Sequence, residues 1–176
     1  FFGLLSVWFS KQENILVYPT GIISVLIYTY ITFQYKLYAD MGINAYYFVM
    51  SVYGWYHWTR GGNDKPQIPI TTNSLRENLV SVGIFIVSFL IVRFGLGFTA
   101  SDVLNWDAFT TATAIAGMWL MAQKKLENWV AWIITDIVAV PLYWYKGLVL
   151  TCFQYFVFTI LATMGYIEWR KRLRAN

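Results

Sequence analysis

The chain has 176 residues, of which 58% are hydrophobic, 20% are aromatic and only 12% are charged. A soluble domain carries about 25% charged residues, so this composition excludes an ordinary soluble protein and predicts a membrane protein with several spans. The net charge of +4 does not indicate nucleic-acid binding, because the basic residues lie in short connections where membrane topology requires them.

Long apolar runs predict helices, because only helices and closed barrels satisfy the backbone in lipid and these runs are too continuous for barrel strands. In chain order we expect seven helices, at about 1–11, 14–35, 40–60, 76–98, 104–124, 128–145 and 147–171. The first is expected to be a partial helix and not a signal peptide, since the chain opens on Phe1 without a charged leader or cleavage site. The predicted fold class is all-α integral membrane, with seven transmembrane helices.

The only long polar connection is RGGNDKPQIPITTNSLR, residues 60–76. Gly61, Gly62, Pro66 and Pro69 exclude a continuing helix there. The stretch TTNSLRE at its end supplies capping residues and predicts the start of the next helix.

The charged residues predict the orientation of the chain in the membrane. When connections are assigned to alternate sides, one side receives Lys11, Arg60, Lys65, Arg76, Lys124, Lys125, Arg170, Lys171, Arg172 and Arg174. The other side receives Lys36 and Lys146, with Arg93 near that end of its helix, and the acids Asp40, Asp102 and Asp107. The positive-inside rule makes the first side cytoplasmic, so the C terminus is expected in the cytoplasm.

Two pairs of segments indicate an internal repeat. FGLLSVWFSKQEN (2–14) aligns with AGMWLMAQKKLEN (116–128) at an offset of 114, which places Glu13 over Glu127. YGWYHWTR (53–60) aligns with MGYIEWRK (164–171) at an offset of 111, with a glycine and a tryptophan in common.

The repeat predicts the domain organisation. We expect a first three-helix bundle at 1–60, a loop and linker helix at 61–100 and a second three-helix bundle at 101–176. One span between the bundles gives both the same orientation, which is a parallel 3+1+3 plan. The substrate path of such a protein is expected between the two bundles, near the midplane.

The start of the sixth helix, ENWVAWIITD, is the strongest candidate site. Helical spacing places Trp129, Trp132 and Asp136 on one face. An acid this far inside a span is costly and usually faces a cavity or a partner. Asp136 is therefore interpreted as an acceptor for substrate hydroxyls or as a coupling-ion site, with a packing hydrogen bond between helices as the alternative.

Aromatic and amide side chains complete the expected site. Tyr53 and Trp55 suit stacking on a flat aromatic or cationic ligand, although a membrane-interface belt explains them equally. Asn44 and Gln154 are amides inside spans, where they need partners in another helix or in a ligand. The further expected lining residues are Trp119, Gln123, Asn128 and Tyr143.

Three aromatic residues near the cytoplasmic ends of their helices, Trp58, Tyr166 and Trp169, are assigned to a gate or interface. Packing or an aromatic belt is the alternative for Trp58. His57 is more simply an interfacial or packing residue than a proton carrier.

No motif for enzymatic chemistry is present. The sequence has no Walker A loop, no His-Glu-x-x-His pair and no Gly-x-Ser-x-Gly elbow. One cysteine, Cys152, and one histidine, His57, exclude a disulfide framework and a Cys/His metal cluster. We therefore expect no catalytic residue, no metal and no cofactor.

Four segments together resemble the PnuC-type nicotinamide riboside transporters, which transport vitamin B3. They are YGWYHW, KKLENWVAWIITD, WYKGLVLTCFQYFVF and GYIEWRKR, and the resemblance covers nearly the whole chain. The chain departs from a strict repeat of Trp-x-x-Trp, because the second bundle has Tyr166-x-x-Trp169. The family is similar to the SWEET sugar carriers in its two parallel three-helix bundles.

The resemblance implies facilitated diffusion of nicotinamide riboside across the bacterial inner membrane, with a cytoplasmic nicotinamide riboside kinase that traps the substrate by phosphorylation. It implies that Trp and Tyr stack on the cationic ring, that amides bind the carboxamide and that Asp136 accepts from ribose hydroxyls. A carrier for thiamine or riboflavin, and a membrane channel or sensor, remain alternatives. The sequence does not show the oligomeric state, and a homo-oligomer stays open.

Overall fold

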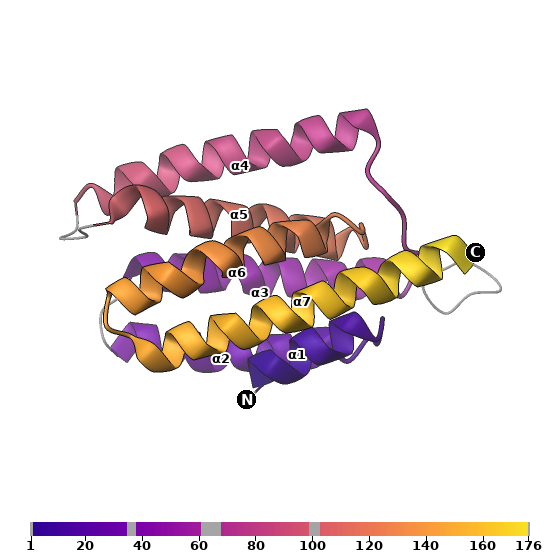
Figure 1. Cartoon of the computed structure of the whole chain (residues 1–176), viewed down its shortest axis with the longest axis horizontal. Helices are drawn as coiled ribbons and strands as arrows, with labels where there is room; N and C mark the ends of the chain where they lie inside the picture. Colours follow the sequence, from indigo (N-terminus) through magenta and orange to yellow (C-terminus); the bar gives the residue numbers. More distant parts are fainter. Residues whose placement is uncertain (1, 35–37, 61–67, 99–102, 176) are drawn as a thin grey trace.

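The structure is a computed structural model and describes residues 2–34, 38–60, 68–98 and 103–175, with the backbone alone for 38–40 (Figure 1). Some of the predictions above fall outside the described residues. They concern Lys36, Gly61, Gly62, Lys65, Pro66 and Asp102, and the side chain of Asp40.

The described residues form seven helices. They are α1 (Phe2–Lys11), α2 (Val17–Gln34), α3 (Tyr38–Trp58), α4 (Leu75–Leu96), α5 (Leu104–Ala122), α6 (Asn128–Tyr145) and α7 (Val149–Ala175). Each predicted helix is present, and its ends differ from the predicted ones by at most four residues. The apolar runs therefore predicted the elements well, because each run is bounded by residues that turn the chain.

The start of α4 confirms the predicted cap. The Ser74 hydroxyl accepts a hydrogen bond from the Glu77 backbone N–H, and the Glu77 carboxylate accepts from the Ser74 N–H. This reciprocal pair is a capping box, which satisfies two backbone donors at the helix end.

Six helices form a closed ring, and α4 packs outside it. Around the ring the neighbours are α1, α2, α3, α5, α6 and α7, and α7 closes the ring by packing on α1. Helix α4 packs on α5 (Figure 1) and has no buried residue. Its apolar side chains are exposed along its length, as expected of a helix that faces lipid. By length and composition α4 and α7 are each able to cross a membrane.

The first and second bundles repeat each other at one constant offset. Both ends of α6 lie 111 positions after the corresponding ends of α2, and α5 ends 111 positions after α1. Glu13 and Lys124, which are also 111 positions apart, both have left-handed backbones, with φ of 60° and 58°. The structure thus confirms the repeat, and the equivalent indole bonds of Trp58 and Trp169 confirm the offset of 111 predicted for YGWYHWTR and MGYIEWRK.

The offset of 114 predicted for the first pair of helices is wrong. Glu13 corresponds to Lys124 in the structure, not to Glu127. The backbone bonds agree, because the Glu13 N–H donates to Ser10 O and the Lys124 N–H donates to Met121 O. The identities between the two apolar segments indicated the wrong alignment. The turns after α1 and α5 have the same backbone geometry but different residue types, so residue identity does not show which positions correspond.

An aromatic layer joins the two bundles at the end where α1, α3, α5 and α7 finish. It consists of Tyr18, Trp58, Trp129 and Trp169, all buried. The ring of Trp58 meets Trp169 with centroids 5.8 Å apart. Tyr18 contacts Trp58 edge-on at 5.2 Å, and Trp129 contacts Trp169 edge-on at 5.5 Å. Each bundle thus contributes one equivalent pair of rings.

Two hydrogen bonds cross between the bundles in this layer. The Trp58 indole N–H donates to Met121 O at 3.1 Å, and the Trp169 indole N–H donates to Ser10 O at 2.9 Å. Donors and acceptors are both 111 positions apart, so each bundle bonds the other in the same way. These reciprocal bonds hold the two bundles together at this end of the ring.

A buried lysine reinforces the same end. The Lys124 ammonium lies 2.7 Å from a Glu13 carboxylate oxygen, and the Arg172 guanidinium lies 3.1 Å from the other oxygen. Lys124 also donates to Ile68 O at 2.6 Å and lies 4.7 Å from the Trp58 ring centroid. This network links the α1–α2 turn, the α5–α6 turn and the residues that lead into α4.

Candidate functional site

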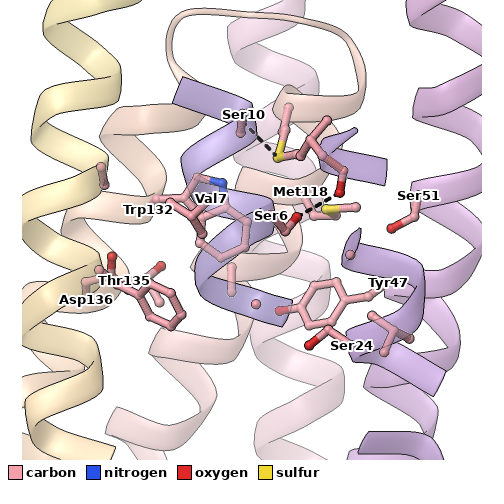
Figure 2. A pocket seen from close by; sticks show the side chains of 18 of the residues that line it. Ser6, Val7, Ser10, Ser24, Tyr47, Ser51, Met118, Trp132, Thr135 and Asp136 are labelled. Atoms are coloured by element: carbon pink, nitrogen blue, oxygen red, sulfur yellow. Dashed lines mark hydrogen bonds between the residues drawn. The ribbon is translucent and has the colours of Figure 1, made fainter. Parts of the chain in front are cut away.

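The ring of six helices encloses a cavity of about 290 Å³ (Figure 2). All six helices of the ring contribute to its lining, and α4 contributes nothing. The volume is close to the lower end of the ~300–1,000 Å³ found for small-molecule sites. The cavity therefore suits a small ligand, and it lies between the bundles, where the repeat predicted the substrate path.

The lining is built from pairs of residues that the repeat relates. Residues separated by the same 111 positions face the cavity from opposite bundles. The pairs are Gly3 and Ala114, Val7 and Met118, Ser10 and Met121, Tyr18 and Trp129, Gly21 and Trp132, Ser24 and Thr135, Val25 and Asp136, Tyr47 and Phe158, and Ser51 and Ala162. The positions that line the cavity are thus pseudo-symmetric, and its two sides differ where the members of a pair differ.

The wall supplied by α6 has the bulky and charged members of these pairs. Trp132, Thr135 and Asp136 lie one helical turn apart at most, so they share one face of α6 (Figure 2). Asp136 is only 4% exposed. No hydrogen bond or ion pair joins it to another described residue, while the Thr135 hydroxyl donates to Ala131 O. Asp136 is also the one formally charged residue among the described residues of the lining.

The opposite wall has the small and hydroxyl-bearing members. Gly21 and Val25 of α2 stand where the second bundle has Trp132 and Asp136. Around them lie the hydroxyls of Ser24, Tyr47 and Ser51, which Figure 2 shows across the cavity from the α6 wall. None of these three hydroxyls bonds to another described residue, so each is available to a ligand.

Tyr155 of α7 extends the aromatic side of the cavity. Its ring stacks on Tyr143 with centroids 5.0 Å apart and planes 8° apart. Tyr143, which the sequence assigned to the lining, therefore lies directly behind Tyr155 and supports it. The Lys146 ammonium lies 5.6 Å from the Tyr143 ring centroid on the side away from the basic end of the chain.

Three residues predicted for the site form a separate cluster. The ring of Tyr53 is parallel to Trp119, at 6.4 Å between centroids, and Gln123 donates to the Tyr53 hydroxyl at 2.8 Å. Trp119 and Gln123 face a second pocket of about 410 Å³ beside the first two turns of α4, and Lys125 lines it too. The structure brings these residues together, but away from the central cavity.

Four other predicted residues also lie away from the cavity. Trp55 and Gln154 are exposed on the outer faces of α3 and α7. Asn44 is half-buried on α3 and is not part of the lining. Asn128 is buried and donates to Lys125 O at 2.6 Å, which stabilises the turn before α6.

The residues assigned to a gate lie at the closed end of the cavity. Trp58 and Trp169 stand directly behind Tyr18 and Trp129, whose rings line the cavity. Tyr166 packs partly buried against the same cluster, with the Arg170 guanidinium 6.0 Å from its ring centroid. The aromatic layer therefore closes the cavity toward the basic end of the chain.

The small residues of the site were not predicted from the sequence. Ser6, Ser10 and Gly3 line the cavity from α1, and Ser24 and Gly21 line it from α2. The available signal was their helical spacing, since small residues at such intervals mark faces where helices approach or enclose space. No group of three or more potential metal ligands occurs among the described residues.

Comparison with known proteins gives a consistent result. A family model described as nicotinamide mononucleotide transporter matches residues 1–171. The nicotinamide riboside transporter PnuC of Escherichia coli (strain K12) is 27% identical over 193 residues, covering 95% of this chain and 81% of the relative. The riboflavin/roseoflavin transporter RibM of Streptomyces davaonensis is 27% identical over 185 residues, covering 99% and 83%.

A solved structure supports the fold directly. The crystal structure of the vitamin B3 transporter PnuC matches with a TM-score of 0.76 and 25% identity, covering 99% of this chain and 79% of the other. The predicted all-α integral membrane fold is thereby confirmed. The relatives are named as transporters, in agreement with a multi-pass membrane protein built around a central cavity.

Proposed function

Because the chain belongs to the nicotinamide mononucleotide transporter family, we propose that it carries nicotinamide riboside across the bacterial inner membrane. The substrate binds in the central cavity between the two bundles. The relatives named as nicotinamide riboside transporters support this assignment, as does the cavity itself.

The observation that carries the proposal is the charge of the cavity lining. Its described residues include one acid, Asp136, and no lysine, arginine or histidine. A phosphate group needs basic side chains or a row of backbone donors, and its charge would be repelled by a carboxylate in a low-dielectric cavity. The lining therefore favours the riboside over the mononucleotide that the family description names.

The size and shape of the cavity favour a nucleoside with one small ring. About 290 Å³ is room for a single heteroaromatic ring with a sugar, whereas the three fused rings of a flavin need more. The rings of Trp132 and Tyr155 are placed to pack on a flat heterocycle. The hydroxyls of Ser24, Tyr47 and Ser51 match the hydroxyls of a ribose.

Transport is proposed to be facilitated diffusion by alternating access. The basic end carries the C terminus and is the cytoplasmic end by the positive-inside rule. Opening toward the cytoplasm requires the two indole bonds from Trp58 and Trp169 to break as one bundle moves against the other. A cytoplasmic kinase then traps the substrate, since the phosphorylated product does not fit the acidic cavity.

Titration calorimetry on the purified protein in detergent tests the proposal. The ligands are nicotinamide riboside, nicotinamide mononucleotide, thiamine and riboflavin. We expect the riboside to bind and the mononucleotide to bind at least tenfold more weakly, which is a difference of about 1.4 kcal/mol or more. Equal or tighter binding of the mononucleotide would contradict the charge argument.

The second candidate function is riboflavin transport, which the similarity to RibM favours. If the protein binds riboflavin and not the riboside, it is still a carrier, and its substrate is riboflavin. Binding of no vitamin, together with unsaturable currents in bilayers, would favour a channel or sensor instead.

A further inference from the structure

A carboxylate without a partner lies in the central cavity. Asp136 is in the middle of α6, 4% exposed, and forms no ion pair or hydrogen bond with another described residue. Leaving an ionised carboxylate unpaired inside a membrane protein costs several kcal/mol. By contrast, Glu13, Glu77 and Asp107 each pair with a lysine, and Glu168 pairs with Arg172. The described residues therefore supply no counter-charge to Asp136.

The surroundings of Asp136 suit one kind of cation. Trp132 precedes it by one turn on the same face of α6, and the ring of Tyr155 lines the same cavity from α7. Aromatic faces attract organic cations, and the attraction is strongest where water is excluded. A small metal ion would need several oxygen ligands, and Asp136 belongs to no cluster of acidic or other ligating residues among those described. An acid beside aromatic rings is the chemistry that binds a charged heterocycle.

The repeat shows that this charge is on one wall only. The residue related to Asp136 in the first bundle is Val25, and the residue related to Trp132 is Gly21. The hydroxyls without partners, those of Ser24, Tyr47 and Ser51, lie on the opposite side of the cavity (Figure 2). A ligand with a charged ring at one end and hydroxyls at the other thus meets different partners at its two ends.

We propose that Asp136 is the counter-charge of a cationic heterocycle and fixes the orientation of the substrate. The inference rests on the proposed function and deepens it. The pyridinium ring of the riboside lies against the α6 wall, and its ribose lies against the hydroxyls of α2 and α3. This assigns Asp136 to the ring, in place of the ribose role that the family resemblance implied.

The test compares two ligands that differ in charge and hardly in size. Nicotinamide riboside carries one positive charge on its ring, and its 1,4-dihydro form has gained a hydride and is neutral. Calorimetry measures the affinity of both for the wild type and for Asp136→Asn, which removes the charge and keeps the shape. Asp107→Asn is the matched control, because Asp107 is paired with Lys146 outside the cavity.

We expect the wild type and Asp107→Asn to bind the cation at least tenfold more tightly than the neutral form. Asp136→Asn should bring the two affinities within about threefold of each other, because it weakens binding of the cation and leaves binding of the neutral form unchanged. Asp136→Glu should keep the preference for the cation. An Asp136→Asn protein that keeps the full preference overturns the proposal, and so does a wild type without any preference.

Two further arms complete the test. Ser24→Ala removes a hydroxyl from the opposite wall and should weaken binding of both forms of the riboside by the same factor. A loss of affinity for the cationic form alone would overturn the proposed orientation. If the wild type binds neither form of the riboside, the proposed function fails. The affinities for cationic thiamine and neutral riboflavin then test the role of Asp136. A preference for thiamine that Asp136→Asn abolishes supports the proposed counter-charge, and any other result overturns it.

Discussion

The two bundles are nearly identical in the aromatic layer and different in the cavity beside it. In the layer, Trp58 and Trp169 make the same bond to the opposite bundle, and each has a ring packed edge-on. In the cavity, Trp132 and Asp136 of the second bundle correspond to Gly21 and Val25 of the first. The two bundles are thus equivalent in the layer and different in the cavity.

The difference has a physical reason. In the proposed transport by alternating access, the layer is the end that opens, and equivalent contacts let both bundles release it by breaking the same kind of bond. A ligand such as a nucleoside has no two-fold symmetry, so its site needs different chemistry on its two walls. Substitutions in the layer therefore test its equivalence, and substitutions in the cavity test the difference between its walls.

The largest effect on stability is expected at two glycines that the repeat relates. A Cβ at Gly54 would lie 2.5 Å from the Tyr18 hydroxyl, and one at Gly165 would lie 2.6 Å from the Trp129 ring. Alanine at either position should lower the free energy of unfolding by about 1–3 kcal/mol, because the rings are held by the layer and have little room to move.

Thermal unfolding in detergent measures these two variants against Gly42→Ala. Gly42 is on the same helix as Gly54, and a Cβ at this position would have nothing within 4 Å. Similar losses for Gly54→Ala and Gly165→Ala would support the equivalence. A loss in Gly42→Ala as large as in the other two would show that the effect is not due to the layer.

The next effect concerns the asymmetric wall of the cavity. Trp132→Ala should weaken binding of nicotinamide riboside by about tenfold or more, since a desolvated contact between an aromatic face and a cation is worth roughly 2 kcal/mol. Trp55→Ala is the control, because that residue is exposed on the outer face of α3. Calorimetry gives both affinities, and a larger loss in the Trp55 variant would refute the location of the site.

A smaller effect is expected from removing the indole donors of the layer one at a time. Trp58→Phe and Trp169→Phe each delete one bond between the bundles, which costs about 1–2 kcal/mol for a buried donor. Trp58→Phe should cost slightly more, because the Lys124 ammonium lies over the Trp58 ring. Chemical unfolding measures both, and a negligible cost for either variant would show that the reciprocal bonds do not hold the bundles together.

The smallest effect is a dependence of stability on pH. Burial lowers the pKa of the Lys124 ammonium from its ordinary value of 10.5, and the hydrogen bond to Glu13 opposes this. Between the lowered pKa and 10.5 the unfolded chain binds more protons than the folded protein, so raising the pH through that window stabilises the fold. Unfolding of the wild type and of Lys124→Met is compared as the pH rises toward 10.5.

The wild type should gain stability relative to Lys124→Met over this range. A relative loss would mean that the attraction between Lys124 and Glu13 outweighs the burial of the ammonium. The two turns that the repeat relates, at Glu13 and Lys124, would then stabilise each other through opposite charges.

The sequence predicted the helices and the plan of the repeat, because runs of apolar residues and the turns between them are local signals. It placed Trp132 and Asp136 on one face of α6, and both line the cavity. The capping residues of TTNSLRE were equally visible, since the two that form the cap, Ser74 and Glu77, are close in sequence. Each of these features depends on spacing within one element.

Other features depend on which helices are neighbours, and the sequence did not show them. Trp55 and Gln154 have suitable chemistry but point out of the ring, because rotation of a helix about its axis is set by packing. Ser24 and Ser51 line the cavity beside glycines of other turns, because a Cβ at Gly3 would lie 3.6 Å from the Ser24 hydroxyl oxygen and one at Gly21 would lie 4.0 Å from that of Ser51. The correct alignment of α1 with α5 in the repeat likewise appeared only in the geometry of the turns after Ser10 and Met121.

The most direct test of the central claim is protection of a cysteine placed in the cavity. Cys152 is first replaced by Ala, and Ser24→Cys or Gln154→Cys is then added, the first inside the cavity and the second on the exposed face of α7. Labelling by a small thiol reagent is timed with and without nicotinamide riboside. We predict that the riboside slows labelling of the cysteine at position 24 at least tenfold and leaves position 154 unaffected. Unchanged labelling at position 24 in protein that demonstrably binds the riboside would contradict the account.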